Sequence, residues 1–371
     1  MTEPTRVAFL SHRADRTGAP LCMLDLVRHR DPRRFAVNVL LGEEGPLIDD
    51  LTAAGAQVEV LPRKLARGSG RILTMRRVVS KMNAHVVHLT SAVGFTKSAA
   101  LATRSLRIPL LWHLHDDFQD PKFRRRRAWV RWLSTRIIAC SESIATEIAS
   151  TKTTVIENGV ELPRLPDLAD QREARRSLGL PEDRPVVLFV GSYTPRKNAL
   201  LIAGAAQRVL AEDSRYTFVM VGGGDKAEYR AEVEARAAGV EGLHLFPERP
   251  DVSTFYRASD LVLMPSMMEC HPRVLLEASA WGLPTVATPV GDVCRMIQDG
   301  RSGWVIPVPT HEAQLLDQLQ PILRQGPTQW RERGRAARSE LAERLDMRLY
   351  VEAFQDEWSR LAGERAVEET A

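Results

Sequence analysis

The sequence has little cysteine and no C-x-x-C pair. Cys22, Cys140, Cys270 and Cys294 lie far apart in a chain of 371 residues. Zinc ribbons need closely spaced cysteines, and disulfide-stapled folds need many of them in a short chain. Both are therefore excluded, and we expect buried thiols in a reducing compartment.

Long hydrophobic runs are also missing. The N-terminus, MTEPTRVAFLSHR, contains an apolar run of only four residues, which is too short for a signal peptide. No window approaches the roughly 18 apolar residues of a membrane span. Hydrophobic residues are 44% and charged residues 26%, ordinary values for a globular protein. We expect a cytoplasmic protein of two domains.

The net charge of +4 hides an uneven distribution. Residues 1–160 hold 25 Lys and Arg against 15 Asp and Glu, a balance of +10, and the remainder has 26 against 32, a balance of −6. The cations concentrate in residues 63–81 and 122–136, the latter interleaved with Phe123, Trp129 and Trp132. Residues 122–136 predict an amphipathic helix that binds anionic membranes weakly at their inner face. The alternative is a solvated face whose tryptophans pack inward. No motif indicates nucleic-acid binding.

The chain is expected to form two successive α/β units. Short strands without polar alternation are typical of parallel sheets covered on both faces. The expected strands are 6–11, 35–41, 57–61, 85–90, 108–114, 136–140, 153–156, 186–190, 216–221, 243–246, 261–264, 285–288 and 304–306. The expected helices are 19–30, 46–54, 70–83, 94–106, 122–135, 141–150, 198–212, 225–238, 251–258, 272–281, 292–299, 311–324 and 327–343.

Residues 161–185 contain four prolines and many charges and are the predicted linker. We therefore expect an N-terminal domain over 1–163, a C-terminal domain over 164–345, and a final helix over 346–371 that crosses back to the N-terminal domain. Two doubly wound sheets joined in this way leave a cleft, and ligands bind at the carboxyl ends of such strands.

The first candidate site is the loop VGSYTPRKN over 190–198. A buried strand leads into a polar loop that carries Arg196 and Lys197, and a helix follows. Backbone amides and the helix dipole converge at such a point, and two cations suit a diphosphate. A solvated cationic turn is the equally weighted alternative.

The second candidate site is PSMMECHPRVLLEA over 265–278. Pro272 suits the first turn of a helix in which Glu277 is surrounded by apolar residues, so this carboxylate needs a partner. Two vicinal ribose hydroxyls would supply one. Glu269 lies just before the helix, where a sugar hydroxyl can reach it, and exposed backbone around Cys270, His271 and Pro272 would hold the sugar and diphosphate. An acidic turn that merely stabilises its own helix is the alternative.

Taken together, the motifs resemble those of the family 4 retaining glycosyltransferases, which have the GT-B fold. Glu269 and Glu277 match the E-x7-E pair of that family, and EASAWGLPTVATPVGD and DGRSGWVIP match its following segments. Further matches are FVGSYTPRKN, IENGV over 156–160, ACSES over 139–143, TGA over 17–19 and the strand from Pro109 to Asp116.

The resemblance implies an N-terminal domain that binds the acceptor and a C-terminal domain that binds a nucleotide-diphosphate-sugar, with UDP favoured over GDP. By position, Glu277 holds the ribose, Glu269 and the 270–272 backbone contact the sugar, and Lys197 neutralises the diphosphate. Gly18 touches a phosphate and His115 lines the sugar. His88 is expected to be a core histidine, and His113 is an even choice between core and site.

The sequence departs from the family pattern at two positions. Ser192 stands where the family has Arg, and Arg295 stands where it has an acidic residue. Arg196 is the expected substitute cation for the first loss.

We therefore expect a retaining, metal-independent transfer of a sugar to an acceptor hydroxyl, with no cofactor and no protein nucleophile. The acceptor is expected to be lipid-linked or an anionic glycan. The alternatives are a catalytically weak nucleotide-sugar-binding partner subunit, suggested by Ser192 and Arg295, and another GT-B enzyme such as a nucleotide-sugar epimerase.

Overall fold

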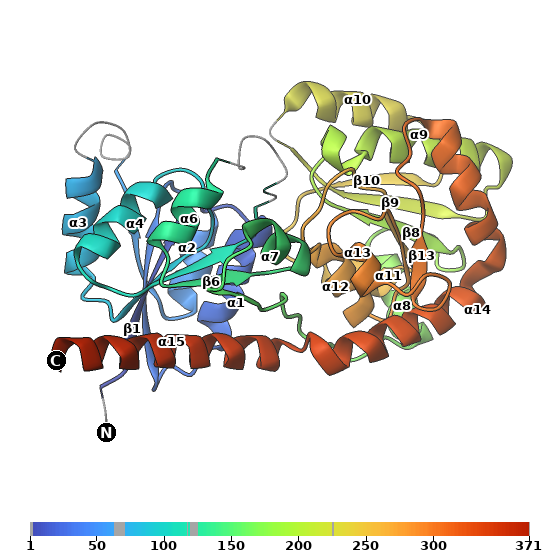
Figure 1. Ribbon diagram of the computed structural model, residues 1–371. Coiled ribbons are helices and arrows are strands. Elements are labelled where there is room, and N and C mark those ends of the chain that lie inside the picture. Colours follow the sequence, from blue (N-terminus) through green and yellow to red (C-terminus); the bar gives the residue numbers. More distant parts are fainter. Residues whose placement is uncertain (1–2, 63–70, 117, 119–124, 225, 371) are drawn as a thin grey trace. The chain divides into compact units, whose positions relative to one another are not determined.

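The computed structural model describes residues 3–62, 71–116, 118, 125–224 and 226–370. These residues form two compact α/β units (Figure 1). Unit 1 comprises Met1–Gly159 together with Met347–Ala371, and unit 2 comprises Val160–Asp346.

Unit 1 is built on a parallel sheet of seven strands in the order β3-β2-β1-β4-β5-β6-β7. Its strands are β1 Thr5–Ser11, β2 Phe35–Leu41, β3 Gln57–Val60, β4 Val86–Leu89, β5 Leu110–Leu114, β6 Arg136–Ala139 and β7 Thr153–Val155. Its helices are α1 Gly18–His29, α2 Leu47–Ala53, α3 Arg71–Lys81, α4 Thr96–Ser105, α6 Arg127–Leu133, α7 Glu142–Ile148 and α15 Met347–Thr370.

Helices cover both faces of this sheet, as the apolar strands predicted. His113 of β5 contacts Phe354 of α15, whereas its neighbour Trp112 contacts Trp129 of α6. Since successive strand residues point to opposite faces, α15 and α6 lie on opposite sides of the sheet. One core joins α1 and α15 to the strands, with Phe9 and Trp358 fully buried in it.

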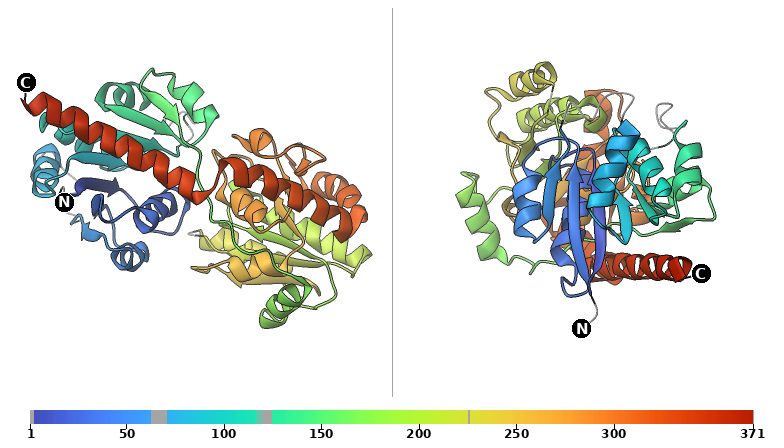
Figure 2. Two further views of the ribbon diagram at one scale, coloured as in Figure 1. Left: turned by 90° about the horizontal axis from the view of Figure 1, so that it is seen from below. Right: turned by 90° about the vertical axis from the view of Figure 1, so that its left-hand side faces the viewer.

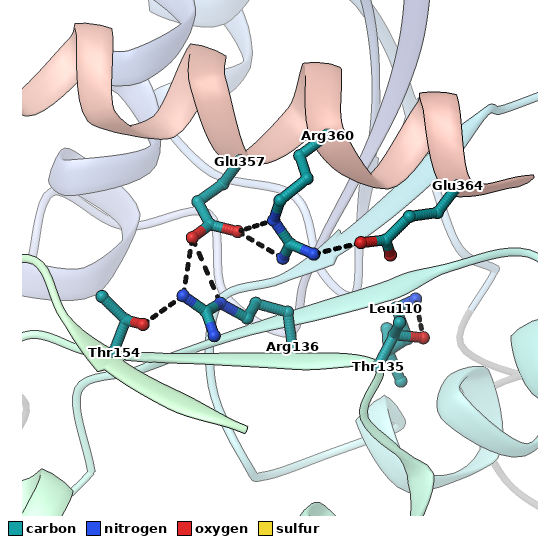
Figure 3. Close-up of polar contacts among 7 residues, drawn as sticks. All are labelled: Leu110, Thr135, Arg136, Thr154, Glu357, Arg360 and Glu364. Atoms are coloured by element: carbon teal, nitrogen blue, oxygen red, sulfur yellow. Dashed lines mark hydrogen bonds and ion pairs between the residues drawn. The ribbon is translucent and has the colours of Figure 1, made fainter. Parts of the chain in front are cut away.

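The C-terminal helix α15 runs along the sheet of unit 1 (Figures 1 and 2). Glu357 of α15 accepts hydrogen bonds from Arg136 of β6 at 2.8 Å and from Arg360 at 2.7 Å (Figure 3). Arg136 also donates to the hydroxyl of Thr154 in β7. The helix is therefore fixed by a polar network at its edge as well as by its apolar face.

Unit 2 is built on a second parallel sheet, with six strands in the order β10-β9-β8-β11-β12-β13. Its strands are β8 Val186–Val190, β9 Thr217–Gly222, β10 Leu243–Pro247, β11 Leu261–Met264, β12 Thr285–Ala287 and β13 Gly303–Val305. Its helices are α8 Leu168–Ser177, the 3-10 turn η1 Pro195–Lys197, α9 Ala199–Glu212, α10 Ala227–Ala237, α11 Ser253–Ala258, α12 Arg273–Ala280, α13 Val293–Met296 and α14 Glu312–Arg344.

Two cores sandwich the sheet of unit 2. One contains the apolar residues of α9 and α14, and the other contains those of α11 and α12. The expected break between two helices near residue 326 is present, because Gly326 has a φ of 77° inside α14.

Two sequence predictions need correction. The predicted linker at 161–185 contains α8, which begins with a capping box at Asp167. The predicted helix at 122–135 is α6, which the structure shows from Arg127 to Leu133, while residues 122–124 lie outside the described residues. Arg63, Lys64 and Arg67 of the other basic segment also lie outside them.

Within the described part of the chain, no helix combines the length and apolarity that crossing a bilayer requires.

Candidate functional site

The candidate residues of unit 2 lie where the strand order of its sheet reverses. The chain moves from β8 outward to β9 and β10, and then returns to β11 on the other side of β8. In open parallel sheets the crevice at such a reversal, beside the carboxyl ends of the strands, is the usual ligand site. Ser192, Arg196 and Lys197 follow β8, while Glu269 through Glu277 follow β11.

Backbone and amide hydrogen bonds join these two loops. Asn198 is buried and has a left-handed backbone, and its side chain donates to the carbonyl of Pro265 at 2.7 Å. The amide of Met267 donates to the carbonyl of Arg196 at 2.8 Å. The cationic turn after β8 is therefore fixed against the segment that leads to Glu269.

Lys197 and Glu269, both predicted catalytic residues, form an ion pair. Lys197 Nζ lies 2.5 Å from Glu269 Oε1, and the two side chains are only 13% and 8% exposed. Screening by water is weak at such burial, so the interaction is stronger than that of a surface pair. A phosphate that binds Lys197 must therefore compete with, or share, the carboxylate of Glu269.

The other two candidate residues of the loop after β8 are open to solvent. Arg196 and Ser192 are exposed, and the Arg196 guanidinium donates to the carbonyl of Met268 at 3.5 Å. Arg196 thus lies beside the segment before Glu269, on the same loop as Lys197. Its predicted role as substitute cation stays a prediction.

The segment from Glu269 to Pro272 is pressed against the loop after β12. Gly291 has a φ of +57°, and a Cβ there would lie 2.3 Å from the carbonyl oxygen of Glu269. The amide of Asp292 donates to the carbonyl of Cys270 at 3.0 Å. We expected exposed backbone over 270–272, but His271 and Pro272 are buried and only Cys270 is half-buried. Close packing by this glycine loop is the physical reason.

Glu277 lies on the second turn of α12 and has two protein partners. Tyr256 Oη donates to Glu277 Oε2 at 2.8 Å, and an Arg273 nitrogen lies 3.5 Å from Glu277 Oε1. From the sequence, a ribose was the predicted partner of this carboxylate; the structure adds two partners within the protein. Its side chain remains 23% exposed. Burial and the adjacent Glu277 carboxylate raise the pKa of Tyr256 well above its usual value, so this hydroxyl remains a donor.

Sequence reasoning missed Tyr256. It lies on α11, 21 residues before Glu277, and is 1% exposed. A tyrosine in a short apolar helix reads as core, and its ring does pack in the core. Only the tertiary packing of α11 against α12 brings its hydroxyl to the carboxylate.

Gly18 and His115 belong to unit 1. Gly18 begins α1 and is exposed. His115 follows β5 directly, and its ring centroid is 4.0 Å from that of His113. His113 and His88 are both 0% exposed, and His88 stacks on Phe9. The prediction that His88 is a core residue is confirmed, and His113 is buried beside it.

Unit 1 has its own polar cluster at the reversal of its strand order, between β1 and β4. The Ser91 hydroxyl lies 3.1 Å from His12 Nδ1, and Asp116 accepts from the amide of Ala92 at 2.6 Å. Arg126 donates to the carbonyl of Ala92 at 2.9 Å. Burial lowers the pKa of His12 to about 4 and raises that of Asp116 to about 6. Sequence reasoning did not single out His12 or Ser91, and it placed Arg126 only in the basic segment 122–136.

Two further predictions concern metal binding and the second departure from the family pattern, Arg295. Across the residues that the structure describes, no group of three His, Cys, Asp or Glu side chains is arranged to hold a metal ion. Arg295 is exposed and lies 3.9 Å from Asp292 through its Nε atom.

Comparison with known proteins places this arrangement in a family. The sequence model described as Glycosyl transferases group 1 matches residues 170–338, and the one described as Glycosyltransferase Family 4 matches residues 16–164. D-inositol 3-phosphate glycosyltransferase 2 of Catenulispora acidiphila is 31% identical over 238 residues, 60% of this chain and 53% of that protein. The chain spans about half the length of the first curated relatives it matches.

A second relative is matched over a larger share of its length. The UDP-Gal:alpha-D-GlcNAc-diphosphoundecaprenol alpha-1,3-galactosyltransferase of Escherichia coli is 26% identical over 304 residues, 74% of this chain and 76% of that protein.

Solved structures show the same fold. HepE of Anabaena in complex with UDP-glucose has a TM-score of 0.84 at 20% identity, covering 96% of this chain and 99% of that one. Sucrose-phosphate synthase from Thermosynechococcus elongatus has a TM-score of 0.76 at 18% identity, covering 97% and 100%. The predicted GT-B fold, with two Rossmann-like units, is confirmed. The two sequence models together account for most of the chain, which belongs to glycosyltransferase family 4.

Proposed function

We propose that this protein transfers a sugar from a UDP-sugar to an acceptor hydroxyl, without a metal and with retention of anomeric configuration. The observation that carries the proposal is the Lys197–Glu269 pair at the strand reversal of unit 2. Glu269 lies on the same segment as Glu277. The pair supplies a cation for a leaving diphosphate and a carboxylate for a sugar.

Loss of the diphosphate is the step that needs help, because negative charge builds up on the bridging oxygen as the glycosidic bond breaks. Lys197 meets that charge at its Nζ atom, and Arg196 adds a second cation on the same loop. Removing a donor of this kind typically costs about 2–4 kcal/mol of transition-state stabilisation. Such a pair of cations supplies the stabilisation that a divalent ion gives in other transferases.

Glu277 holds the ribose in this proposal. Each of its carboxylate oxygens has two lone-pair directions, and Tyr256 and Arg273 each approach a different oxygen. Two vicinal ribose hydroxyls donate to the remaining directions. The Glu269 carboxylate and the half-buried backbone at Cys270 orient the sugar.

Retention requires the acceptor oxygen to attack the face that the diphosphate leaves. The C–O bond to the acceptor forms as the bond to the diphosphate breaks, and the acceptor proton passes to the departing phosphate. No protein nucleophile takes part.

An acceptor attached to a lipid phosphate suits this protein best. The Escherichia coli relative is named for a diphosphoundecaprenol-linked sugar as its acceptor. In unit 1, Arg126 adjoins the His12, Ser91 and Asp116 cluster at the strand reversal, where an anionic acceptor would be attracted. UDP is favoured over GDP because the structurally similar HepE was solved with UDP-glucose.

Incubation of the protein with radiolabelled UDP-sugars tests the proposal. The assay includes EDTA, and runs with and without a detergent-solubilised sugar-diphosphopolyprenol. We expect acceptor-dependent transfer of label, and an α-linked product by NMR when an α-linked donor is used. Binding without turnover would favour the partner-subunit alternative suggested by Ser192 and Arg295. A changed donor sugar without an acceptor would favour an epimerase.

A further inference from the structure

Three neighbouring helices of unit 1, α3, α4 and α6, carry no acidic residue. The sequences of α3, α4 and α6 contain no Asp or Glu, and α3 ends with three cations, Arg76, Arg77 and Lys81. The three helices contact one another in this order and lie side by side in Figure 1. Three adjacent helices with cations and no acid among them are unusual on a chain that has 47 acidic residues.

Exposed apolar side chains lie among these cations. Ile72 is 44% exposed, Leu73 66% and Trp132, near the end of α6, 58%. Leu73 also lines a groove with Arg76, Arg77, Ser80, Lys81 and Leu106. Large apolar side chains so exposed indicate a surface that meets an apolar phase rather than water alone.

The patch is held together by its own contacts. Arg104 of α4 lies over the ring of Trp132, 4.8 Å from its centroid, and Arg76 of α3 donates to the Ser105 hydroxyl at 2.7 Å. The three helices therefore present Leu73, the α3 cations and Trp132 from one fixed frame.

The segment expected to bind membranes, 122–136, is by contrast only partly exposed where the structure describes it. Arg127 and Arg131 donate to the carbonyls of Glu147 and Ile148 of α7. Trp129 packs on the buried Trp112, with 5.1 Å between ring centroids. Of the two tryptophans, one packs inward and only Trp132 is exposed, so the outward cationic and apolar groups are mainly those of α3.

We propose that α3, with Arg104 and Trp132 beside it, docks this protein on an anionic lipid bilayer. The cations bind lipid phosphates, while Leu73, Ile72 and the Trp132 ring enter the interfacial layer. An anionic bilayer binds both the cations and the exposed apolar side chains. A soluble polyanion binds only the cations, because it has no apolar phase for Leu73. This docking requires neither the donor nor the acceptor of the proposed function.

Cosedimentation with vesicles tests the proposal, using the full chain without nucleotide. The vesicles are phosphatidylcholine with 30% phosphatidylglycerol, or phosphatidylcholine alone as control. We expect binding to the anionic vesicles only, weaker at physiological than at low salt. Arg77→Ser with Lys81→Ser should reduce the partition coefficient roughly thirtyfold, while Arg172→Ser with Arg208→Ser, the same charge loss at exposed arginines of unit 2, should not.

A second pair of variants isolates the apolar contribution. Leu73→Ser should weaken binding severalfold, whereas Leu168→Ser, at a leucine 59% exposed on α8, should leave it unchanged. Unfolding midpoints verify that all four variants fold. Equal binding to both vesicle types, or no effect of the α3 variants, overturns the proposal. If charge loss matters but Leu73→Ser does not, the patch is a site for a soluble polyanion and the bilayer is excluded.

Discussion

Glu277 and Tyr256 illustrate how one carboxylate is prepared for a ligand. The tyrosine hydroxyl, held by a buried ring, fixes one carboxylate oxygen at 2.8 Å, and Arg273 approaches the other. The side chain therefore cannot turn freely when it accepts from a ribose. Pre-orientation of this kind reduces the entropy lost on binding.

Replacement of Glu277 by alanine should weaken UDP binding by about 2 kcal/mol, roughly thirtyfold, because two charged hydrogen bonds to the ribose are lost. Tyr256→Phe keeps the buried ring but removes the hydroxyl, and should weaken binding roughly fivefold. Donor KM should rise in Tyr256→Phe while kcat changes little, since the ribose does not react. Titration calorimetry and steady-state kinetics measure both effects.

Glu228→Ala provides the matched control, because Glu228 is an exposed carboxylate on α10 of the same unit. Its UDP affinity should equal that of the parent. If Glu277→Ala binds UDP as tightly as Glu228→Ala does, the ribose assignment fails.

The cations after β8 should act on turnover. Lys197→Ala should lower kcat roughly 30- to 1,000-fold, which corresponds to the roughly 2–4 kcal/mol of a lost transition-state donor. Lys226→Ala, at an exposed lysine of unit 2, is the control and should leave kcat unchanged. The substitution also leaves Glu269 buried without its cation, so the unfolding midpoint is measured alongside.

Arg196 and Ser192 give a sharper test of the substitute-cation idea. Arg196→Ala should reduce kcat roughly tenfold, and the double variant Ser192→Arg with Arg196→Ala should recover part of that loss. Kinetic comparison of the three proteins decides the matter. If kcat does not recover in the double variant, Arg196 does not replace the missing arginine.

For single residues, the sequence indicated which side chains carry charge at the site but not which partners they contact. Lys197 and Glu269 lie 72 positions apart, and no local pattern reports their ion pair. A ribose was expected as the partner of Glu277 because its helix is apolar, yet Arg273 of the same helix and Tyr256 of α11 both approach it. Hydrogen bonds between distant elements depend on packing, which spacing alone does not reveal.

Among the secondary-structure elements, α8 is fixed by a buried ion pair. Arg175 donates to Asp260 at 2.6 Å with both side chains under 7% exposed, and Asp260 also accepts from the amide of Val186 at 2.7 Å. Burial raises the pKa of Asp260, and Arg175 opposes that rise. The pair connects α8 to the beginning of β8 and to the residue before β11.

Loss of one partner of this pair should be costly. Asp260→Asn leaves the Arg175 charge buried without a counter-charge and should lower the free energy of unfolding by about 3 kcal/mol. The double variant Arg175→Met with Asp260→Asn should be less destabilised than the two single variants added together. Denaturant unfolding of all three measures the coupling, and strict additivity would contradict it.

Strands were better predicted than the segment that carries this pair. The strands at 35–41, 186–190 and 261–264 coincide with β2, β8 and β11, because continuous β-branched and apolar runs report burial on both faces. Residues 161–185 were interpreted as a linker because prolines and charges predict an irregular exposed segment. The helix α8 within them has few buried residues, so its apolar pattern was too weak to recognise.

For the whole molecule, buried histidines should make the protein sensitive to acid. Burial lowers the pKa of His88 and His113 well below the usual 6.5, and that of His12 to about 4. The unfolded chain takes up these protons below pH 6.5 while the folded chain does not. Stability is therefore complete above pH 6.5 and should fall by about 1.4 kcal/mol per pH unit for each histidine.

Asp116 acts in the opposite direction over part of this range. Its pKa is raised from 3.8 to about 6. Between these pH values the folded chain binds this proton more readily than the unfolded chain, so the stability gained offsets the loss caused by one histidine. Urea unfolding at pH 7.5, 6.5, 5.5 and 4.5 should show a decline that begins below pH 6.5 and is shallower for His113→Phe. A flat profile from pH 7.5 to 4.5 would contradict this account.

The central claim is that the strand reversal of unit 2 binds a UDP-sugar through Lys197, Glu269 and Glu277. A crystal structure of the protein with UDP tests it most directly. The account predicts the ribose hydroxyls within hydrogen-bond distance of the Glu277 carboxylate and the diphosphate in contact with Lys197 Nζ. A nucleotide bound elsewhere, or one at this site with its ribose turned away from Glu277, would contradict it.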